Sequence, residues 1–340
     1  MRGVWCRLGL CVVLGACGFR SASGAGPGGD DTGSNGNDGP MDAGAGMDAG
    51  ASDGSAAADT CWSHWMDGTV AIVPDSAKEI TELTATGTNR NPWISSDGRT
   101  MYFTRDLADT NHTDTYMATR TTPTGVFDGG TRVQNVSTAD DETRVWLTSD
   151  QLTIAISTNH SAGQLEIHMD VRGAVGGTFG TPTTTHLNAV NSPGSERIDP
   201  WLSDDGLHLY WAADTNGGKL QIRMSTRGST NDDFGMPSVV GGFPTGGPTN
   251  FADPTLYQNE QLILFSTAPQ GNSPGTGDLW YARRANATAD FEPMTKIPVD
   301  TDTEAEFDPA LSADGCDLYY ASNHGHANSV LQLFHARIVK

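Results

Sequence analysis

The sequence predicts an all-β fold, a β-propeller of about five four-stranded blades, on three observations. A unit of about 54 residues recurs five times along the chain. Each unit contains alternating, aromatic-rich stretches of strand length, and no stretch in this part of the chain keeps a helical period. Four strands per unit, repeated in series, are typical of propeller blades. A count of six blades is the alternative.

The spacing of the units is regular. One apolar column contains Trp93, Trp146, Trp201, Thr255 and Ala310, at intervals of 53, 55, 54 and 55 residues. Each unit opens with a short strand that continues into a turn, Ser-Asp-Gly in its clearest form. The turn column contains Asp97, Asp150, Asp205, Asn259 and Asp314. A side-chain oxygen at this position bonds nearby backbone N–H groups, so we assign these residues to structure.

The remaining strands follow in order within each unit. The second strand is aromatic-rich (LHLYWA), the third follows a polar loop (LQIRMSTR), and a looser fourth precedes the next unit. The fifth unit reaches Lys340 just after its third strand. An unpaired blade edge is a pairing hazard. We therefore expect Ile80–Leu83, together with Val70–Val73, to supply the missing strand.

The N-terminal part of the chain has a different composition. Residues 1–16 carry two Arg and a short apolar run, which is typical of an export signal, and Leu14–Cys17 resembles a lipobox. This predicts lipidation at Cys17 and attachment to the outer membrane of the cell envelope, on its periplasmic or surface face. Residues 17–60 are rich in Gly, Ala and Asp, so we expect a disordered tether. Residues 61–340 form the predicted propeller.

The cysteines predict a disulfide, and the net charge restricts the classes of partner. Cys6 and Cys11 lie in the signal, which leaves Cys61 and Cys316 as one pair at the two ends of the folded body. We predict a disulfide between them. The net charge of −21 argues against nucleic acid or an anionic lipid surface as partner. It is compatible with metal cations, basic peptides or neutral sugars, and equally with a simple role in solubility.

Residues 89–338 resemble the WD40-like propeller repeat family called PD40, which also occurs in the TolB propeller. The resemblance rests on the Pro-x-Leu/Ile-Ser-x-Asp-Gly-x-x-Leu-Tyr-Phe pattern and the Asp-Leu-Tyr-like third strand. The second unit lacks both the Pro and the Gly, and the fourth has Tyr-Gln-Asn-Glu at its turn. The resemblance implies a propeller that acts as a binding module in the envelope.

Acidic residues before the first strand of each unit are the candidate binding site. They are Asp140, Asp141, Glu142, Glu196, Asp199, Asp253, Glu304, Glu306 and Asp308. If the units are equivalent, these residues recur around one rim, where they would bind Ca²⁺ or a cationic peptide. The alternative is that Asp199, Asp253 and Asp308, each followed by Pro, cap turns or bond between blades.

Sequence motifs for catalysis are scarce. The one Gly-x-Ser-x-Gly match, Gly271–Gly275, lies in a Gly/Pro-rich loop instead of a strand-to-helix elbow. We therefore expect a monomeric, lipid-anchored scaffold that binds an envelope protein or peptide, with no enzyme activity and no required cofactor. The alternative is a carbohydrate-binding or glycoside-hydrolase-like propeller at the cell surface, with a glycan or peptidoglycan partner. Carboxylates converging deep in the channel would favour hydrolysis.

Overall fold

The structure is a computed structural model. It describes residues 60–106, 112–159, 164–192, 196–214, 219–244, 249–269, 277–299, 304–327 and 330–340. The predicted signal, the lipidation site Cys17, nearly all of the predicted tether and the Gly271–Gly275 motif lie outside these residues.

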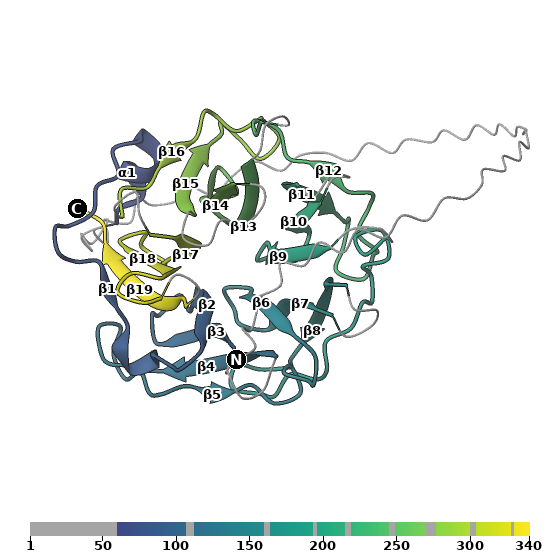
Figure 1. The fold of residues 1–340 in the computed structure, drawn as a ribbon. Coiled ribbons are helices and arrows are strands. Elements are labelled where there is room, and N and C mark those ends of the chain that lie inside the picture. Colours follow the sequence, from purple (N-terminus) through teal and green to yellow (C-terminus); the bar gives the residue numbers. More distant parts are fainter. Residues whose placement is uncertain are drawn as a thin grey trace, which may run out of the picture. The chain divides into compact units, whose positions relative to one another are not determined.

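Five antiparallel sheets are arranged in a ring around a central axis, which confirms the predicted propeller of five four-stranded blades (Figure 1). We call the region along this axis, which buried side chains fill, the channel. Blade 1 contains β2 (Thr88–Ile94), β3 (Thr100–Asp106), β4 (Thr113–Thr119) and β5 (Thr131–Arg132). Blade 2 contains β6 (Glu142–Leu147), β7 (Thr153–Thr158) and β8 (Glu166–Val171). Blade 3 contains β9 (Arg197–Leu202), β10 (His208–Asp214), β11 (Leu220–Thr226) and β12 (Ser238–Val239). Blade 4 contains β13 (Thr249–Tyr257), β14 (Leu262–Pro269), β15 (Asp278–Arg283) and β16 (Thr295–Lys296).

Blade 5 joins the two ends of the folded body. It contains β17 (Glu306–Leu311), β18 (Asp317–Ser322), β19 (Gln332–Arg337) and, on its outer edge, β1 (Lys78–Glu79). An N-terminal strand therefore closes the ring, as predicted, but the strand lies between the two expected segments, just before Ile80–Leu83. Within Val70–Val73, Ile72 forms an isolated antiparallel bridge with Ile338. Ile80 still donates its N–H to Leu333, and the chain then turns into the short helix η1 (Thr81–Leu83). The apolar side chains of this segment pack in the core between blades 5 and 1. They are therefore buried, whereas an outer edge strand would expose part of them to solvent.

The fourth strands are short. Those of blades 1, 3, 4 and 5 contain two residues each, and in blade 2 an isolated bridge between Met169 and Thr183 takes this place. Side chains complete the bonding where backbone pairing stops. The amide of Asn191 bonds both the N–H and the C=O of Ile167 on β8. This leaves less of the blade edge free to pair with another chain.

The hairpin turns have the predicted chemistry. Asp97 accepts the N–H of Arg99 and the hydroxyl of Ser95, and Gly98 has a φ of +66°. The fourth unit, which lacks the Ser-x-Asp-Gly pattern, builds its turn from consecutive left-handed residues that end at Glu260, with a φ of +63°. A left-handed glutamate is costly, so contacts of its side chain must hold it there.

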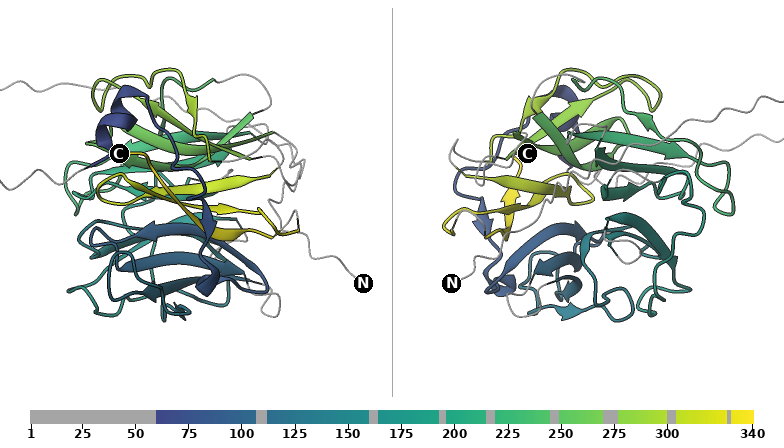
Figure 2. Two further views of the ribbon diagram at one scale, coloured as in Figure 1. Left: turned by 90° about the vertical axis from the view of Figure 1, so that its left-hand side faces the viewer. Right: turned by 45° about the vertical axis from the view of Figure 1, so that its right-hand side comes forward.

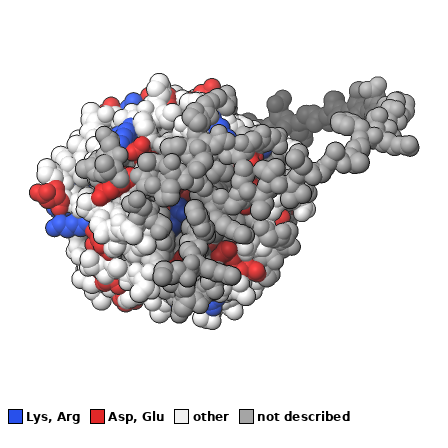
Figure 3. Space-filling view, viewed as in Figure 1, with Lys and Arg blue, Asp and Glu red and all other residues white. Residues whose placement is uncertain are grey.

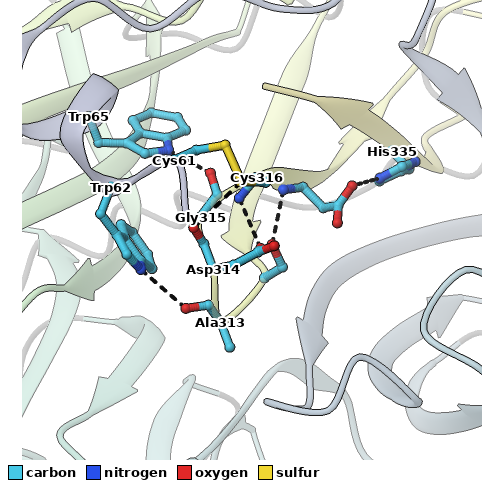
Figure 4. Close-up of a disulfide and its surroundings, with 10 residues drawn as sticks. Cys61, Trp62, Trp65, Ala313, Asp314, Gly315, Cys316 and His335 are labelled. Carbon is cyan, nitrogen blue, oxygen red and sulfur yellow. Dashed lines mark hydrogen bonds and ion pairs between the residues drawn. A yellow bond between two sulfur atoms is a disulfide. The ribbon is translucent and has the colours of Figure 1, made fainter. Parts of the chain in front are cut away.

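Cys61 and Cys316 form the predicted disulfide (Figure 4). It fixes helix α1 (Trp62–Asp67) against blades 4 and 5. Trp65 donates its indole N–H to Gly315 at 2.8 Å and meets the Tyr281 ring edge to face. The turned views of Figure 2 show α1 at the margin of the ring. A disulfide is consistent with an exported protein. No helix among the described residues is long and apolar enough to cross a membrane.

A repeated Arg–Phe contact occurs within blades 1 to 4, and three of the same Arg side chains also bind the preceding blade. Just after the third strand of blades 1 to 4, an Arg stacks on a Phe seven residues later, at 4.3 to 4.4 Å. The pairs are Arg120–Phe127, Arg172–Phe179, Arg227–Phe234 and Arg284–Phe291. Three of these Arg also donate to a Tyr hydroxyl of the preceding blade, at Tyr319, Tyr102 and Tyr210. The rigid ring that results positions the innermost strands around the channel.

Candidate functional site

Each innermost strand contributes one residue to a ring at the centre of the propeller. In blade order these residues are Asn91, Arg144, Asp199, Asp253 and Asp308, and we call them the channel ring. They come from β2, β6, β9, β13 and β17, the strands that lie nearest the channel in Figure 1. Arg144 on blade 2 approaches both Asp253 on blade 4 and Asp308 on blade 5. Such contacts between blades that are not neighbours cross the channel, so the ring lies on its axis.

The local backbone explains why these side chains meet there. Asn91, Asp199, Asp253 and Asp308 each precede a Pro and have a φ of +55° to +60°. Asn and Asp tolerate this left-handed conformation better than other residues with a side chain. The register of each innermost strand shifts at this point, which marks a β-bulge. Bulges redirect a side chain out of the regular pleat, here into the channel.

The three carboxyl groups form a chain from blade to blade. Asp199 accepts the backbone N–H of Asp253 at 3.3 Å, and Asp253 accepts the N–H of Asp308 at 3.4 Å. Asp253 also accepts the hydroxyl of Ser266. The three carboxyl groups therefore lie close enough together for the charge of each to affect its neighbours.

Two guanidinium groups offset the charge of the carboxyl groups. Arg144 Nη1 lies 3.4 Å from Asp308 Oδ1 and 3.7 Å from Asp253 Oδ1, and Arg90 Nε lies 3.1 Å from Asp308 Oδ2. Asn91 donates its amide to Asp308 at 2.6 Å. Arg144 is only 1% exposed, and its Nε and Nη2 have no hydrogen-bond partner among the described residues. The guanidinium therefore keeps two donors unused inside the channel.

Burial raises the pKa of all three carboxyl groups. Asp199, Asp253 and Asp308 are 6%, 2% and 0% exposed. Loss of hydration is the main cause of the rise, which brings the pKa of Asp308 to about 7. Repulsion between neighbouring carboxylates adds to it, and the two Arg oppose it. Burial thus favours the protonated form of each of the three carboxyl groups, whereas the two Arg favour the ionised form.

Glu142, two residues before Arg144, is a second buried acid. Desolvation raises its pKa to about 7, against hydrogen bonds from the Thr138 hydroxyl and N–H. A cavity of about 10 Å³ lies beside it, with Thr158 and His168 in its wall. A cavity of this size is near the lower limit for one water molecule, so it offers no space for a larger ligand.

The other acidic residues of the predicted rim bond within their own surroundings. Asp141 accepts from Thr113 and from Asn159, and Glu304 lies 2.5 Å from His324. Glu306 is buried and accepts from Ser322. Glu196 is partly buried near the charge of Asp214, and the N–H of Asp140 donates to Thr138.

Only Asp199, Asp253 and Asp308 of the predicted set converge in the channel ring. Figure 3 shows acidic side chains in small separate groups on the described part of one face.

Sequence reasoning did not single out Arg144 or Arg90 as site residues. The signal for Arg144 was present, because Arg144 occupies the column of Asn91, Asp199, Asp253 and Asp308. A cation in a column otherwise filled by Asp and Asn indicates a counter-charge. Among the described residues, no group of three or more His, Cys, Asp or Glu is arranged to hold a metal ion. Calcium binding stays a prediction.

No protein-family model matches the sequence, and no curated protein is similar to it. Solved structures share the fold. A GH43_1 enzyme from Xanthomonas citri, complexed with xylose, is 15% identical with a TM-score of 0.52, covering 77% of this chain and 89% of that one. An α-L-arabinofuranosidase from Podospora anserina, in complex with cellotriose, is 9% identical with a TM-score of 0.50, covering 75% and 91%.

A putative TolB from Agrobacterium tumefaciens also matches, at 13% identity and a TM-score of 0.44, over 77% of this chain and 89% of that one. The propeller fold that the PD40 resemblance implies is present, whereas membership of that repeat family stays a prediction. The expectation of a protein without enzyme activity is wrong. It assumed that a propeller with no added catalytic module only binds, whereas the two neighbours with the same fold described above are glycosidases or their relatives.

Proposed function

We propose that the protein acts on glycans, as a glycoside-hydrolase-like propeller whose acid–base groups are Asp199, Asp253 and Asp308. The observation that carries this proposal is the convergence of these carboxyl groups, from three consecutive blades, on the channel axis. The fold shared with glycoside hydrolases favours this function over the binding of a protein or peptide. The low sequence identity means that the substrate must be found by experiment.

Cleavage of a glycosidic bond needs two carboxyl groups in different protonation states. One protonates the leaving oxygen, and the other, ionised, activates water or forms the covalent intermediate. Asp308, with a pKa of about 7 and no exposed surface, is the proposed acid. Asp199, the most exposed of the three, is the proposed partner on the solvent side. Asp253 lies between them, and its pKa depends on both neighbouring groups.

Arg144 has a place in the same proposal. Its unused Nε–H and Nη2–H are adjacent donors, which suit the hydroxyl oxygens of a sugar. Its charge also limits how far the pKa values of Asp253 and Asp308 rise. A substrate must displace the tight packing around the ring before it meets these groups, because every ring side chain is nearly buried.

The setting is proposed from the sequence and the disulfide. The Cys61–Cys316 bond is consistent with export, and the lipobox-like segment at Cys17 suggests a lipid anchor at the outer membrane. A protein held there would meet extracellular or envelope glycans. Mass spectrometry of the mature N-terminus tests the proposed anchor. We expect an acylated Cys17 at the N-terminus, and an unmodified N-terminus at another residue would contradict the anchor.

The direct test is a hydrolysis screen with the full-length protein. Xylan, arabinan and cello-oligosaccharides are suitable first substrates, because the neighbouring structures contain xylose and cellotriose or are arabinofuranosidases. Release of reducing sugar, lost in Asp308→Asn, supports the proposal. Retention of a glycan without cleavage would reduce the protein to a carbohydrate-binding module. If the protein neither cleaves nor retains any of these glycans, the proposed action on glycans is refuted.

A further inference from the structure

A groove lies at the seam where blade 5 meets blade 1, apart from the channel ring. Its volume is about 420 Å³, which is within the range of small-molecule sites. One wall consists of the closing strand β1 and its neighbour β19 on blade 5, and the other of residues 120–127 after β4 on blade 1. Figure 1 shows β1 and β19 next to blade 1 at this seam. A ligand here would touch both ends of the closed ring.

The acidic groups of the groove already have partners within the protein. Asp317 lies 2.7 Å from His335 Nε2. Glu79 accepts from the Thr84 hydroxyl at 2.5 Å and lies 3.1 Å from His326. These carboxylates are therefore already paired on the blade 5 side of the groove and are poor sites for a further cation.

Glu82 and Arg120 are engaged as well. Glu82 accepts the N–H of Phe127. Arg120 donates to the carbonyl of Gly98 and to the hydroxyl of Tyr319, and it stacks on Phe127. The guanidinium is fixed as part of the wall, so it contributes positive potential without moving toward a ligand.

Two cations in the groove remain without a side-chain partner among the described residues. Lys78 and Arg337 are both exposed, and no hydrogen bond or ion pair of either side chain is present there. Lys78 lies opposite His335 in the β1–β19 pair, and Arg337 lies two residues after His335. Their side chains therefore share one face of the blade, at the spacing of diagonal neighbours. In a chain with a net charge of −21, a pair of unpaired cations beside a groove is unexpected.

We propose that this groove binds a small organic carboxylate, whose charged group is held by Lys78 and Arg337. Charge-assisted hydrogen bonds to ammonium and guanidinium groups are the strong ones for a carboxylate. Val126, which is 74% exposed, offers an apolar surface to the body of the ligand on the opposite wall. Because the ligand would bridge β1 and blade 1, it would stabilise the closed propeller and raise its melting temperature. The site does not depend on the proposed glycan activity.

A carboxylate can come from an acidic sugar or from a peptide, and two probes separate these sources. Trigalacturonate and N-acetyl-trialanine carry the group on a sugar and on a peptide, and the trimethyl ester of trigalacturonate and the amide of N-acetyl-trialanine are their neutral counterparts. Melting temperature and calorimetric affinity are measured with the full-length protein. We expect one acid probe to bind and raise the melting temperature, and its neutral counterpart to bind about tenfold more weakly or not at all.

Variants locate the site. Lys78→Gln combined with Arg337→Gln should weaken the binding probe about tenfold or more. Lys296→Gln, which removes a partly buried cation on blade 4 that pairs with Asp278, should leave the affinity unchanged. Asp253→Asn should also leave it unchanged, because the channel ring is a separate site. The proposal is overturned if neither acid probe binds at millimolar concentration, if ester or amide binds equally well, or if the double variant keeps the affinity.

Discussion

Arg144 and Asp308 meet across the channel, with Nη1 3.4 Å from Oδ1, although they belong to blades 2 and 5. Both side chains are almost fully buried. Arg144 is the one member of the channel ring with a positive charge, since the other four are Asn91 and three Asp. Within the ring, compensation of the carboxylate charge therefore comes from Arg144 alone, which belongs to the least regular repeat.

Replacement of Arg144 by Met should destabilise the protein strongly. It leaves buried carboxyl groups without their counter-charge, and loss of one partner of a buried pair costs about 3–5 kcal/mol. Urea unfolding at pH 7 measures this change. Arg99→Met, at an exposed turn, is the matched control with an expected change below about 0.5 kcal/mol. The difference should shrink at pH 5, where protonated carboxyl groups no longer need the cation, and a loss equal at both pH values would contradict this.

The raised pKa of Glu142 predicts a specific pH dependence. A carboxyl group with a pKa of about 7 when folded and about 4 when unfolded binds more protons in the folded state. Its contribution to stability is complete below pH 4 and is lost as the pH rises through 7. In Glu142→Gln, the free energy of unfolding should fall less over this interval, by on the order of 3 kcal/mol. Parallel stability profiles for the two proteins would show that Glu142 does not titrate in this range.

The Tyr hydroxyl groups that bind Arg of the next blade should differ in importance. Tyr210 donates to Glu260 at 2.7 Å and accepts from Arg284 at 2.9 Å, whereas Tyr102 accepts one longer bond of 3.4 Å from Arg172. Tyr210→Phe should cost about 1–3 kcal/mol and Tyr102→Phe less than half as much. Thermal unfolding of both variants checks the ranking. If Tyr102→Phe costs more stability than Tyr210→Phe, the hydrogen bonds of these hydroxyl groups do not determine their contribution to the contact between blades.

The disulfide should stabilise the protein mainly by lowering the conformational entropy of the unfolded chain. It joins residues 255 positions apart, and a loop of this length corresponds to about 5 kcal/mol in the chain-entropy model. Cys61→Ser with Cys316→Ser should approach this loss, and wild type under reducing conditions should match the double variant. If reduction leaves the urea midpoint unchanged, packing of α1 alone holds this end of the chain.

The sequence predicts those features that depend on neighbouring residues. The Ser-Asp-Gly turn bonds within its own hairpin, so Asp97 and its equivalents could be assigned to structure, and the regular spacing established the five blades. The Cys61–Cys316 pair followed from elimination and from the need to join the ends. The acidic column was recognised, but not which of its members would converge.

The missing features depend on contacts between distant segments. Glu260 replaces a turn glycine, and only the structure shows that it receives Tyr210 and Arg284 from either side of the seam. The closing strand was expected at Ile80–Leu83 together with Val70–Val73, on the strength of their apolar residues. The polar pair Lys78–Glu79 forms the strand instead, and Ile72 adds an isolated bridge to Ile338. An outer edge strand faces solvent, so apolarity was the wrong guide at this position.

The most direct test of the central claim is the rate of glycan hydrolysis by variants of the channel ring. On the substrate found by screening, Asp308→Asn and Asp199→Asn should each lower kcat about 100-fold or more, as loss of an acid or base does. Asp205→Asn, a turn residue outside the ring, should keep the wild-type rate while all three proteins remain folded. If the ring variants retain wild-type kcat, the channel carboxyl groups are structural and the proposed acid–base role is wrong.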